Sequence, residues 1–93
     1  MNSRPNRSEL YLYIAYAIAE RGTCPRKKAG AVITSMDNRI ISTGYNGPPK
    51  NSPSCTCDIV KPCERAIHAE ANAIYAAARF GIQLAGAKMY CTD

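Results

Sequence analysis

Long apolar segments are absent from this chain of 93 residues. The apolar stretch at residues 11–19 lies between charged residues and is far shorter than the roughly 20 residues that a helix needs to cross a bilayer. The charged start at residues 1–7 is not followed by the apolar region of a secretory signal. We therefore expect no membrane role and no secretion.

The chain also lacks the even number of cysteines that a disulfide scaffold requires, since it contains five. Without a secretory signal, this odd number favours a reducing, cytoplasmic setting in which the thiols are available for a metal. Internal repeats, low-complexity tracts and domain linkers are missing as well. With 46% hydrophobic and 20% charged residues, the sequence is typical of one soluble globular domain over residues 1–93.

Acidic residues are few, with 7 Asp and Glu against 12 Lys and Arg, and the formal net charge is +5. This excess fits an anionic partner, either a nucleic acid or a phosphorylated small molecule, because clustered basic residues concentrate anions. A basic surface kept for solubility explains the charge equally well. Charge alone therefore does not identify the partner.

Apolar residues at helical spacing predict a first helix at residues 8–21, with Ser8 as its cap and Gly22 after its end. Its expected buried positions are Leu10, Ile14, Ala17 and Ile18. Its three tyrosines are expected at the edge of the core or at a subunit contact, and they are Tyr11, Tyr13 and Tyr16.

Alanine-rich residues 66–80 predict a second helix that ends at Gly81. Its expected apolar face consists of Ile67, Ala71, Ile74 and Ala78.

Short β-branched runs predict a hairpin of two strands at residues 29–34 and 39–44, and a third strand at residues 87–92. A loop rich in turn formers spans residue 45 to about residue 65, and loops of this length are usually functional or held by other groups. The order helix, strand, strand, helix, strand predicts an α/β fold in which helices flank a sheet. Because no strand follows residues 87–92, we expect the sheet to be C-terminally incomplete.

The triplet His68-Ala69-Glu70 near the start of the second predicted helix is the most informative in the chain. His68 is the only histidine, and Glu70 lies within the first helical turn, where unpaired amides and the helix dipole stabilise developing negative charge. An imidazole binds zinc well, and a neighbouring carboxylate outside the metal's ligands can shuttle a proton. A lone histidine without such context is more often a packed or exposed residue than a ligand.

This H-x-E arrangement is the first half of the zinc deaminase signature, whose second half, P-C-x-x-C, does not occur in the chain. Further matching segments follow the family's order along nearly the whole chain: residues 23–26, 30–33, 40–49, 63, 68–74 and 86–90. Together they resemble deoxycytidylate deaminases, within the cytidine and deoxycytidylate deaminase superfamily. The concatenation is specific, whereas H-A-E alone would be a weak signal.

The resemblance implies a layered cytidine-deaminase-like sheet and zinc-dependent hydrolysis of dCMP to dUMP. It implies that His68 binds the catalytic zinc and that Glu70 is the general acid and base, moving a proton from water to the pyrimidine ring and the leaving ammonia. Asn46 corresponds to the asparagine that hydrogen-bonds the substrate sugar, although Asn46-Gly47 taken alone is simply a turn. Ala69 joins this candidate substrate-binding set. Arg26 and Lys28 are candidate contacts to a 5′-phosphate, with a solvated basic turn as an equal alternative.

In the family, the helix that bears P-C-x-x-C directly follows the third strand, which places it after Asp93. Cys91 does not replace it, because a ligand inside a strand cannot reproduce two cysteines on one helical turn. We therefore expect an N-terminal part of a deaminase that forms a homo-oligomer or pairs with a complementing C-terminal half. A non-catalytic partner fragment is a further alternative.

The remaining cysteines resemble the ligands of a structural zinc in some phage and bacterial relatives. This resemblance assigns Cys24, Cys63 and one of Cys55 or Cys57 to a closed tetrahedral site. Unligated thiols are the alternative.

Two other functions compete with the dCMP deaminase interpretation. A zinc-binding module built from Cys55, Cys57, Cys63 and His68 would make the chain a nucleic-acid binder, but the spacing fits loosely and leaves Glu70 unexplained. A deaminase of free nucleosides or of a tRNA adenosine shares H-A-E. The loop at residues 45–49, with the positions of Cys24 and Cys63, favours the deoxycytidylate branch.

Overall fold

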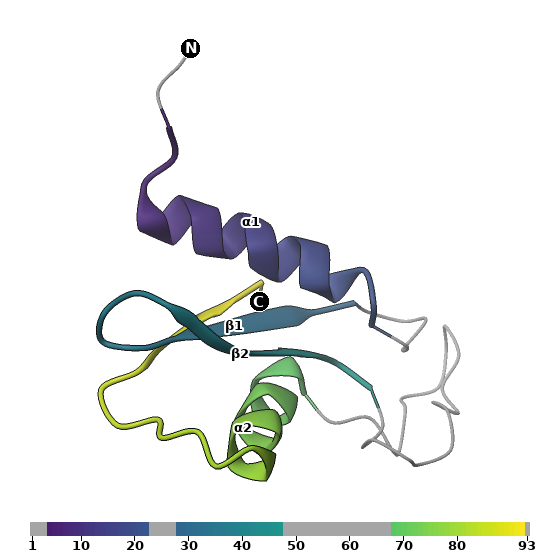
Figure 1. The fold of residues 1–93 in the computed structure, drawn as a ribbon. Helices are drawn as coiled ribbons and strands as arrows, with labels where there is room; N and C mark the ends of the chain where they lie inside the picture. The colour runs from purple at the N-terminus through teal and green to yellow at the C-terminus, as the bar shows by residue number, and fades with distance from the viewer. Residues whose placement is uncertain (1–3, 23–27, 48–67, 93) are drawn as a thin grey trace.

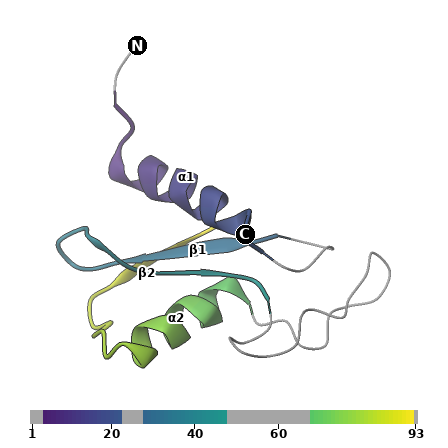
Figure 2. The ribbon, with the colours of Figure 1, turned by 45° about the vertical axis from the view of Figure 1, so that its right-hand side comes forward.

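The computed structural model describes residues 4–22, 28–47 and 68–92, which form two helices and three strands. In chain order these elements are α1 (Arg7–Ala19), β1 (Gly30–Thr34), β2 (Ile40–Tyr45), α2 (Ala69–Arg79) and β3 (Lys88–Cys91). The sheet has the order β2-β1-β3, and both pairings are antiparallel. The two helices cover opposite faces of the sheet (Figure 1, Figure 2). The predicted element order and α/β class are confirmed.

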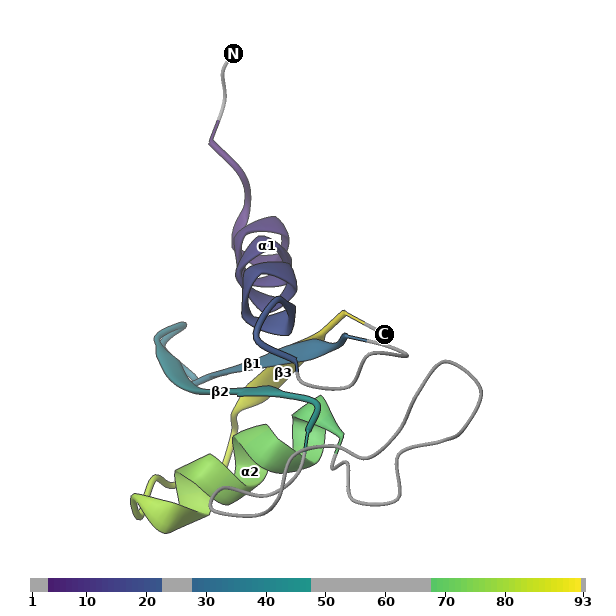
Figure 3. The ribbon, with the colours of Figure 1, turned by 90° about the vertical axis from the view of Figure 1, so that its right-hand side faces the viewer.

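The central strand β1 is buried at every position because both of its faces are covered. Side chains alternate along a strand, so Val32 packs with Tyr11 and Ala15 of α1, whereas Ala31 and Ile33 pack with α2. Figure 3 shows α1 and α2 on either side of this strand. The core thus consists of two thin apolar layers with β1 between them.

Two strand glycines allow the helix backbones to lie directly on the sheet. A Cβ at Gly30 would overlap the carbonyl oxygen of Ala15 and lie 2.7 Å from the Ala19 nitrogen. A Cβ at Gly44 would overlap the Ala69 carbonyl oxygen and the Ala73 nitrogen. Close contact of this kind requires small side chains on the helices as well as on the strands.

This close packing corrects the predicted buried face of both helices. On α1 the buried residues are Tyr11, Ala15 and Ala19, and Leu10 is 41% exposed. On α2 the buried residues are Ala69, Ala73 and Ala77, and Ile74 is also 41% exposed. The predicted faces followed the spacing of apolar residues along each helix, and of their members Ile14 is half-buried against the core while Ile67 lies outside the described residues. The strand glycines instead admit small residues of the helices, namely Ala15, Ala19, Ala69 and Ala73.

The start of α1 also differs from the prediction. Asn6, not Ser8, is the N-cap: its Oδ1 accepts from the Glu9 nitrogen at 2.8 Å, and its own nitrogen donates to Glu9 Oε1 at 2.9 Å. This reciprocal pair is a capping box, which satisfies two helix-end donors at once. The helix ends at Ala19, two residues before the predicted end.

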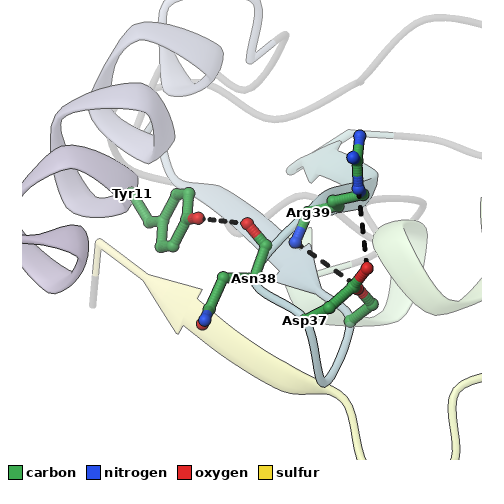
Figure 4. Close-up of polar contacts among 5 residues, drawn as sticks. Tyr11, Asp37, Asn38 and Arg39 are labelled. Atoms are coloured by element: carbon green, nitrogen blue, oxygen red, sulfur yellow. Dashed lines mark hydrogen bonds and ion pairs between the residues drawn. The ribbon is translucent and has the colours of Figure 1, made fainter.

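Of the three α1 tyrosines, only Tyr11 reaches the core. Its hydroxyl donates to the Asn38 carbonyl oxygen in the β1–β2 turn (Figure 4). The centroid of its ring lies 5.1 Å from the centroid of the Tyr90 ring. Asn38 adopts a positive φ of 67°, a conformation that asparagine tolerates in turns. Tyr13 and Tyr16 point outward and are 62% and 58% exposed.

The last strand, β3, completes one side of the sheet. Its pairing with β1 continues at Thr92, whose nitrogen donates to the Gly30 oxygen at 3.0 Å and whose Oγ1 accepts from the Gly30 nitrogen at 3.1 Å. Among the described residues no strand pairs with the other edge of β3. Within the same residues, no helix is long and apolar enough to span a membrane.

Candidate active site

The first turn of α2 is attached to the end of β2 (Figure 3). Gly44 contacts the backbone of α2, and Ser42 Oγ donates to the Ala73 carbonyl oxygen at 2.7 Å. Asn72 Nδ2 donates to the carbonyl oxygens of Tyr45 and Gly47, at 2.8 Å and 3.4 Å. These contacts position the H-A-E triplet beside the residues that follow β2.

His68 is the N-cap of α2, and its backbone is extended rather than helical. Its carbonyl oxygen accepts from the Asn72 nitrogen at 3.0 Å, but its side chain makes no capping hydrogen bond. The residue is exposed. The helix therefore does not use the imidazole, and a donor of this kind fits one position of a zinc site.

Glu70 lies in the first turn of α2, is half-buried, and acts electrostatically on the end of β3. Burial raises the pKa of the Cys91 thiol above its ordinary value, and the negative charge of Glu70 raises it further. Ala69, between His68 and Glu70, is 1% exposed and packs in the core with Ala31. The triplet therefore has one buried member and two on the accessible side of the helix.

Asn46 is buried where the end of α1 and the start of β1 meet the end of β2. Its Oδ1 accepts from the Ala29 nitrogen at 2.9 Å, and its own nitrogen donates to the Ala29 oxygen at 3.2 Å. A Cβ at Gly22 would lie 2.6 Å from Asn46 Oδ1, so this side chain is enclosed tightly. The orientation of the Asn46 amide is therefore fixed by the fold.

Several predicted site residues lie outside the described residues, namely Cys24, Arg26, Cys55, Cys57 and Cys63. Lys28 is described and exposed. Within residues 4–22, 28–47 and 68–92, no group of three His, Cys, Asp or Glu side chains could hold a metal. A catalytic zinc takes three protein ligands, and this part of the chain supplies a single imidazole, His68, towards that set.

Asn72 connects α2 to the turn that carries Asn46, and it was not among the site residues predicted from the sequence. The available signal was its spacing, because residues four apart lie on the same helical face and Asn72 follows His68 by four. Its contacts with residues 45 and 47 join positions that are 27 and 25 residues apart in the chain, so spacing alone did not reveal them.

Residues 5–93 match the family described as the cytidine and deoxycytidylate deaminase zinc-binding region. ComE operon protein 2 of Bacillus subtilis (strain 168) is 37% identical over 89 residues, which cover 91% of this chain and 47% of that protein. The deoxycytidylate deaminase of Mycobacterium phage D29 is 40% identical over 105 residues, which cover 97% of this chain and 80% of the phage protein.

The crystal structure of a dCMP deaminase from the cyanophage S-TIM5, in complex with dCMP and dUMP, has the same arrangement of elements. It superposes with a TM-score of 0.84 at 26% sequence identity, covering 98% of this chain and 68% of the phage chain. The present chain thus spans between about half and four-fifths of the length of these relatives. On its sequence and its fold, the chain belongs to the cytidine and deoxycytidylate deaminase family, whose zinc-binding region matches nearly all of it.

Proposed function

We propose that this chain supplies the histidine and glutamate part of the active site of a zinc-dependent dCMP deaminase, which converts dCMP and water to dUMP and ammonia. The proposal is supported by the arrangement of side chains at the start of α2. His68 has an imidazole that the helix does not use, Glu70 lies in the first turn, and residues 45–47, the Asn46 turn, are hydrogen-bonded to the same helix.

In this proposal His68 is one zinc ligand, and zinc when bound supplies Lewis acidity that makes water nucleophilic at neutral pH. Glu70 accepts one proton of the water as its oxygen adds to C4 of the cytosine ring, and passes this proton to ring N3. It then takes the remaining hydroxyl proton and passes it to the amino group, so that the C4–N bond breaks, C4=O forms and ammonia leaves. The helix N-terminus supports this role, because its unpaired amides stabilise negative charge nearby.

We propose that Asn46, Lys28 and Arg26 recognise the substrate; the resemblance to the family adds Ala69, although its side chain packs in the core. Lys28 precedes Ala29, whose nitrogen donates to the side chain of Asn46. A basic residue therefore lies one position before the residue that binds Asn46, which we assign to the sugar, and the 5′-phosphate of a nucleotide is attached to that sugar. This arrangement supports a nucleotide over a free nucleoside as the substrate.

A second, structural zinc is proposed at Cys24, Cys63 and one of Cys55 or Cys57. Three thiolates and one further donor make the closed tetrahedral set of such sites. The odd number of cysteines also supports a reducing, cytoplasmic setting for the protein.

We further propose that a P-C-x-x-C segment provides the remaining catalytic ligands and that the protein works as an oligomer or a complemented pair. The unpaired edge of β3 within the described residues supports this, since such edges favour pairing with another strand. Large apolar side chains are also exposed on α2 and at its end, among them Ile74, Tyr75 and Phe80.

Replacement of Glu70 by glutamine tests the proposed reaction in the active protein, which carries this chain together with a P-C-x-x-C segment. Glu70→Gln keeps the size of the side chain but cannot accept the proton, so turnover of dCMP should fall by at least about a hundredfold while zinc content is unchanged. Glu9→Gln, in the first turn of α1, is the matched control and should keep full activity. Full activity in Glu70→Gln would refute the assigned role.

A further inference from the structure

Asn72 is the one residue whose side chain connects the helix of the H-A-E triplet to both sides of Asn46 among the described contacts. It lies one helical turn after His68, to whose carbonyl oxygen its nitrogen donates at 3.0 Å. Its Nδ2 donates to the Tyr45 oxygen at 2.8 Å and to the Gly47 oxygen at 3.4 Å. A side-chain amide has two N–H groups, so it can serve both carbonyls, which flank Asn46 in the chain.

Asn46 is held on its other side by Ala29, the residue that precedes β1. Ala29 donates to its side chain and accepts from its backbone, at 2.9 Å and 3.2 Å. Ala29 and Asn72 thus hold residues 45–47, the Asn46 turn, from two sides, and Asn72 does so from the first turns of α2. A polar group fixed in this way needs no rearrangement when a ligand arrives, which favours binding.

Helix formation does not explain an asparagine at this position. The helix α2 contains six alanines among its 11 residues, and asparagine favours caps and turns over helix interiors because it competes for backbone hydrogen bonds. Asn72 is also half-buried, so it is not simply a solvated residue. The two carbonyls that it contacts give this side chain a role beyond helix formation.

We propose that Asn72 is a positioning residue for substrate recognition: it holds the Asn46 turn against the helix that carries His68 and Glu70, without touching the substrate. This inference rests on the proposed dCMP deaminase function, in which Asn46 contacts the sugar. Loss of Asn72 should then weaken recognition of the sugar more than it slows the reaction. The expected signature is a raised KM for dCMP with a smaller change in kcat.

A double-mutant cycle in the active protein tests the proposal, using Asn72→Ala, Asn46→Ala and the double variant. Each is assayed with dCMP and with an analogue that lacks the sugar 3′-hydroxyl. We expect Asn72→Ala to lower kcat/KM for dCMP by roughly tenfold and to reduce the preference for dCMP over the analogue. The double variant should be no worse than Asn46→Ala, because Asn72 acts through Asn46.

Ser42→Ala is the matched control, because it removes another side-chain hydrogen bond between β2 and α2, the 2.7 Å bond to the Ala73 oxygen. It should lower stability without changing the substrate preference. Alanine is the best helix former, so Asn72→Ala is expected to fold. The proposal would be overturned if the losses of kcat/KM in the two single variants multiplied in the double variant, or if Asn72→Ala left the preference for dCMP over the analogue unchanged.

Amide hydrogen exchange of the Asn46 nitrogen, followed by NMR, provides a readout that does not depend on activity. This N–H donates to the Ala29 oxygen and should exchange faster in Asn72→Ala but not in Ser42→Ala. An unchanged exchange rate in Asn72→Ala would contradict the positioning role. If the wild-type protein did not deaminate dCMP, the proposed function would fail while the exchange measurement still decided whether Asn72 holds the turn.

Discussion

Thr34, at the end of β1, is fully buried, and its hydroxyl oxygen has no hydrogen-bond partner among the described residues. Valine has nearly the same shape without the hydroxyl, so Thr34→Val should raise the free energy of unfolding by about 1 kcal/mol. Urea unfolding should show a higher midpoint with an unchanged slope. The matched control is Thr43→Val on β2, where the side chain is half-buried and the change should be small. Lower stability of Thr34→Val would show that the hydroxyl has a partner.

The thiol of Cys91 should respond to the charge of Glu70. Burial is the larger reason for its raised pKa and the Glu70 carboxylate the second, so Glu70→Gln should lower the pKa of Cys91 only part of the way to its ordinary value. Because the thiolate is the reactive form, alkylation of Cys91 at mildly alkaline pH should be faster in Glu70→Gln than in the wild type. Mass spectrometry of the Cys91 peptide across a pH series measures this rate. Glu9→Gln removes an equal charge from α1 and should leave the profile unchanged.

The raised pKa of Cys91 makes the stability of the fold decrease at alkaline pH. Above the ordinary pKa of a thiol, the unfolded chain loses the Cys91 proton while the folded chain keeps it, so the unfolded state binds fewer protons there. The contribution of Cys91 to stability therefore falls as pH rises through this range and is unaffected at lower pH.

At the scale of elements, the contact of α2 with β2 depends on Gly44. A methyl group there would overlap two backbone atoms of α2, which must then move away from the sheet together with His68 and Glu70. We expect Gly44→Ala to lower the free energy of unfolding by about 2 to 3 kcal/mol and to reduce dCMP turnover in the active protein. Thermal unfolding and steady-state kinetics measure the two effects.

Gly81 is the control for this change, because it lies just after α2 with a positive φ of 68°, and a methyl group at this position would meet no atom within 4 Å among the described residues. Gly81→Ala should cost about 1 kcal/mol for the left-handed backbone and leave turnover unchanged. Equal effects of the two substitutions would contradict the view that Gly44 sets the height of α2 above the sheet.

At the scale of the whole molecule, we predict that the 93-residue chain alone binds about one zinc and does not deaminate dCMP. The cysteines of the proposed structural site are present, whereas His68 alone cannot hold a catalytic zinc with three protein ligands. Elemental analysis should find the metal lost in Cys24→Ser and retained in His68→Ala. Robust turnover by the purified chain would contradict the prediction.

The same sample tests assembly, because the unpaired edge of β3 within the described residues and the exposed apolar side chains of α2 should favour association. Light scattering should find species larger than one chain, and a segment with P-C-x-x-C should change their size and restore turnover. A stable monomer indifferent to that segment would argue against a complemented pair.

By itself the sequence determined the order of elements and the location of the H-A-E triplet. The strand ends were predicted to within about one residue, because β-branched runs bounded by turn residues are a local signal. The family could also be predicted from the sequence, because its motifs follow one another along the chain. The match over residues 5–93 confirms the deaminase family over the alternative of a nucleic-acid-binding zinc module.

Only the tertiary structure decided which helical faces are buried and which residues surround the triplet. Gly30 and Gly44 select the alanine stripes of α1 and α2 over the larger apolar residues, since bulky side chains would hold the helix backbones away from the strands. Asn72 became visible as the link to the Asn46 turn through hydrogen bonds between distant segments, and Cys91 as a thiol within the electrostatic reach of Glu70. Such contacts depend on the distance between packed layers, which periodicity within one segment does not specify.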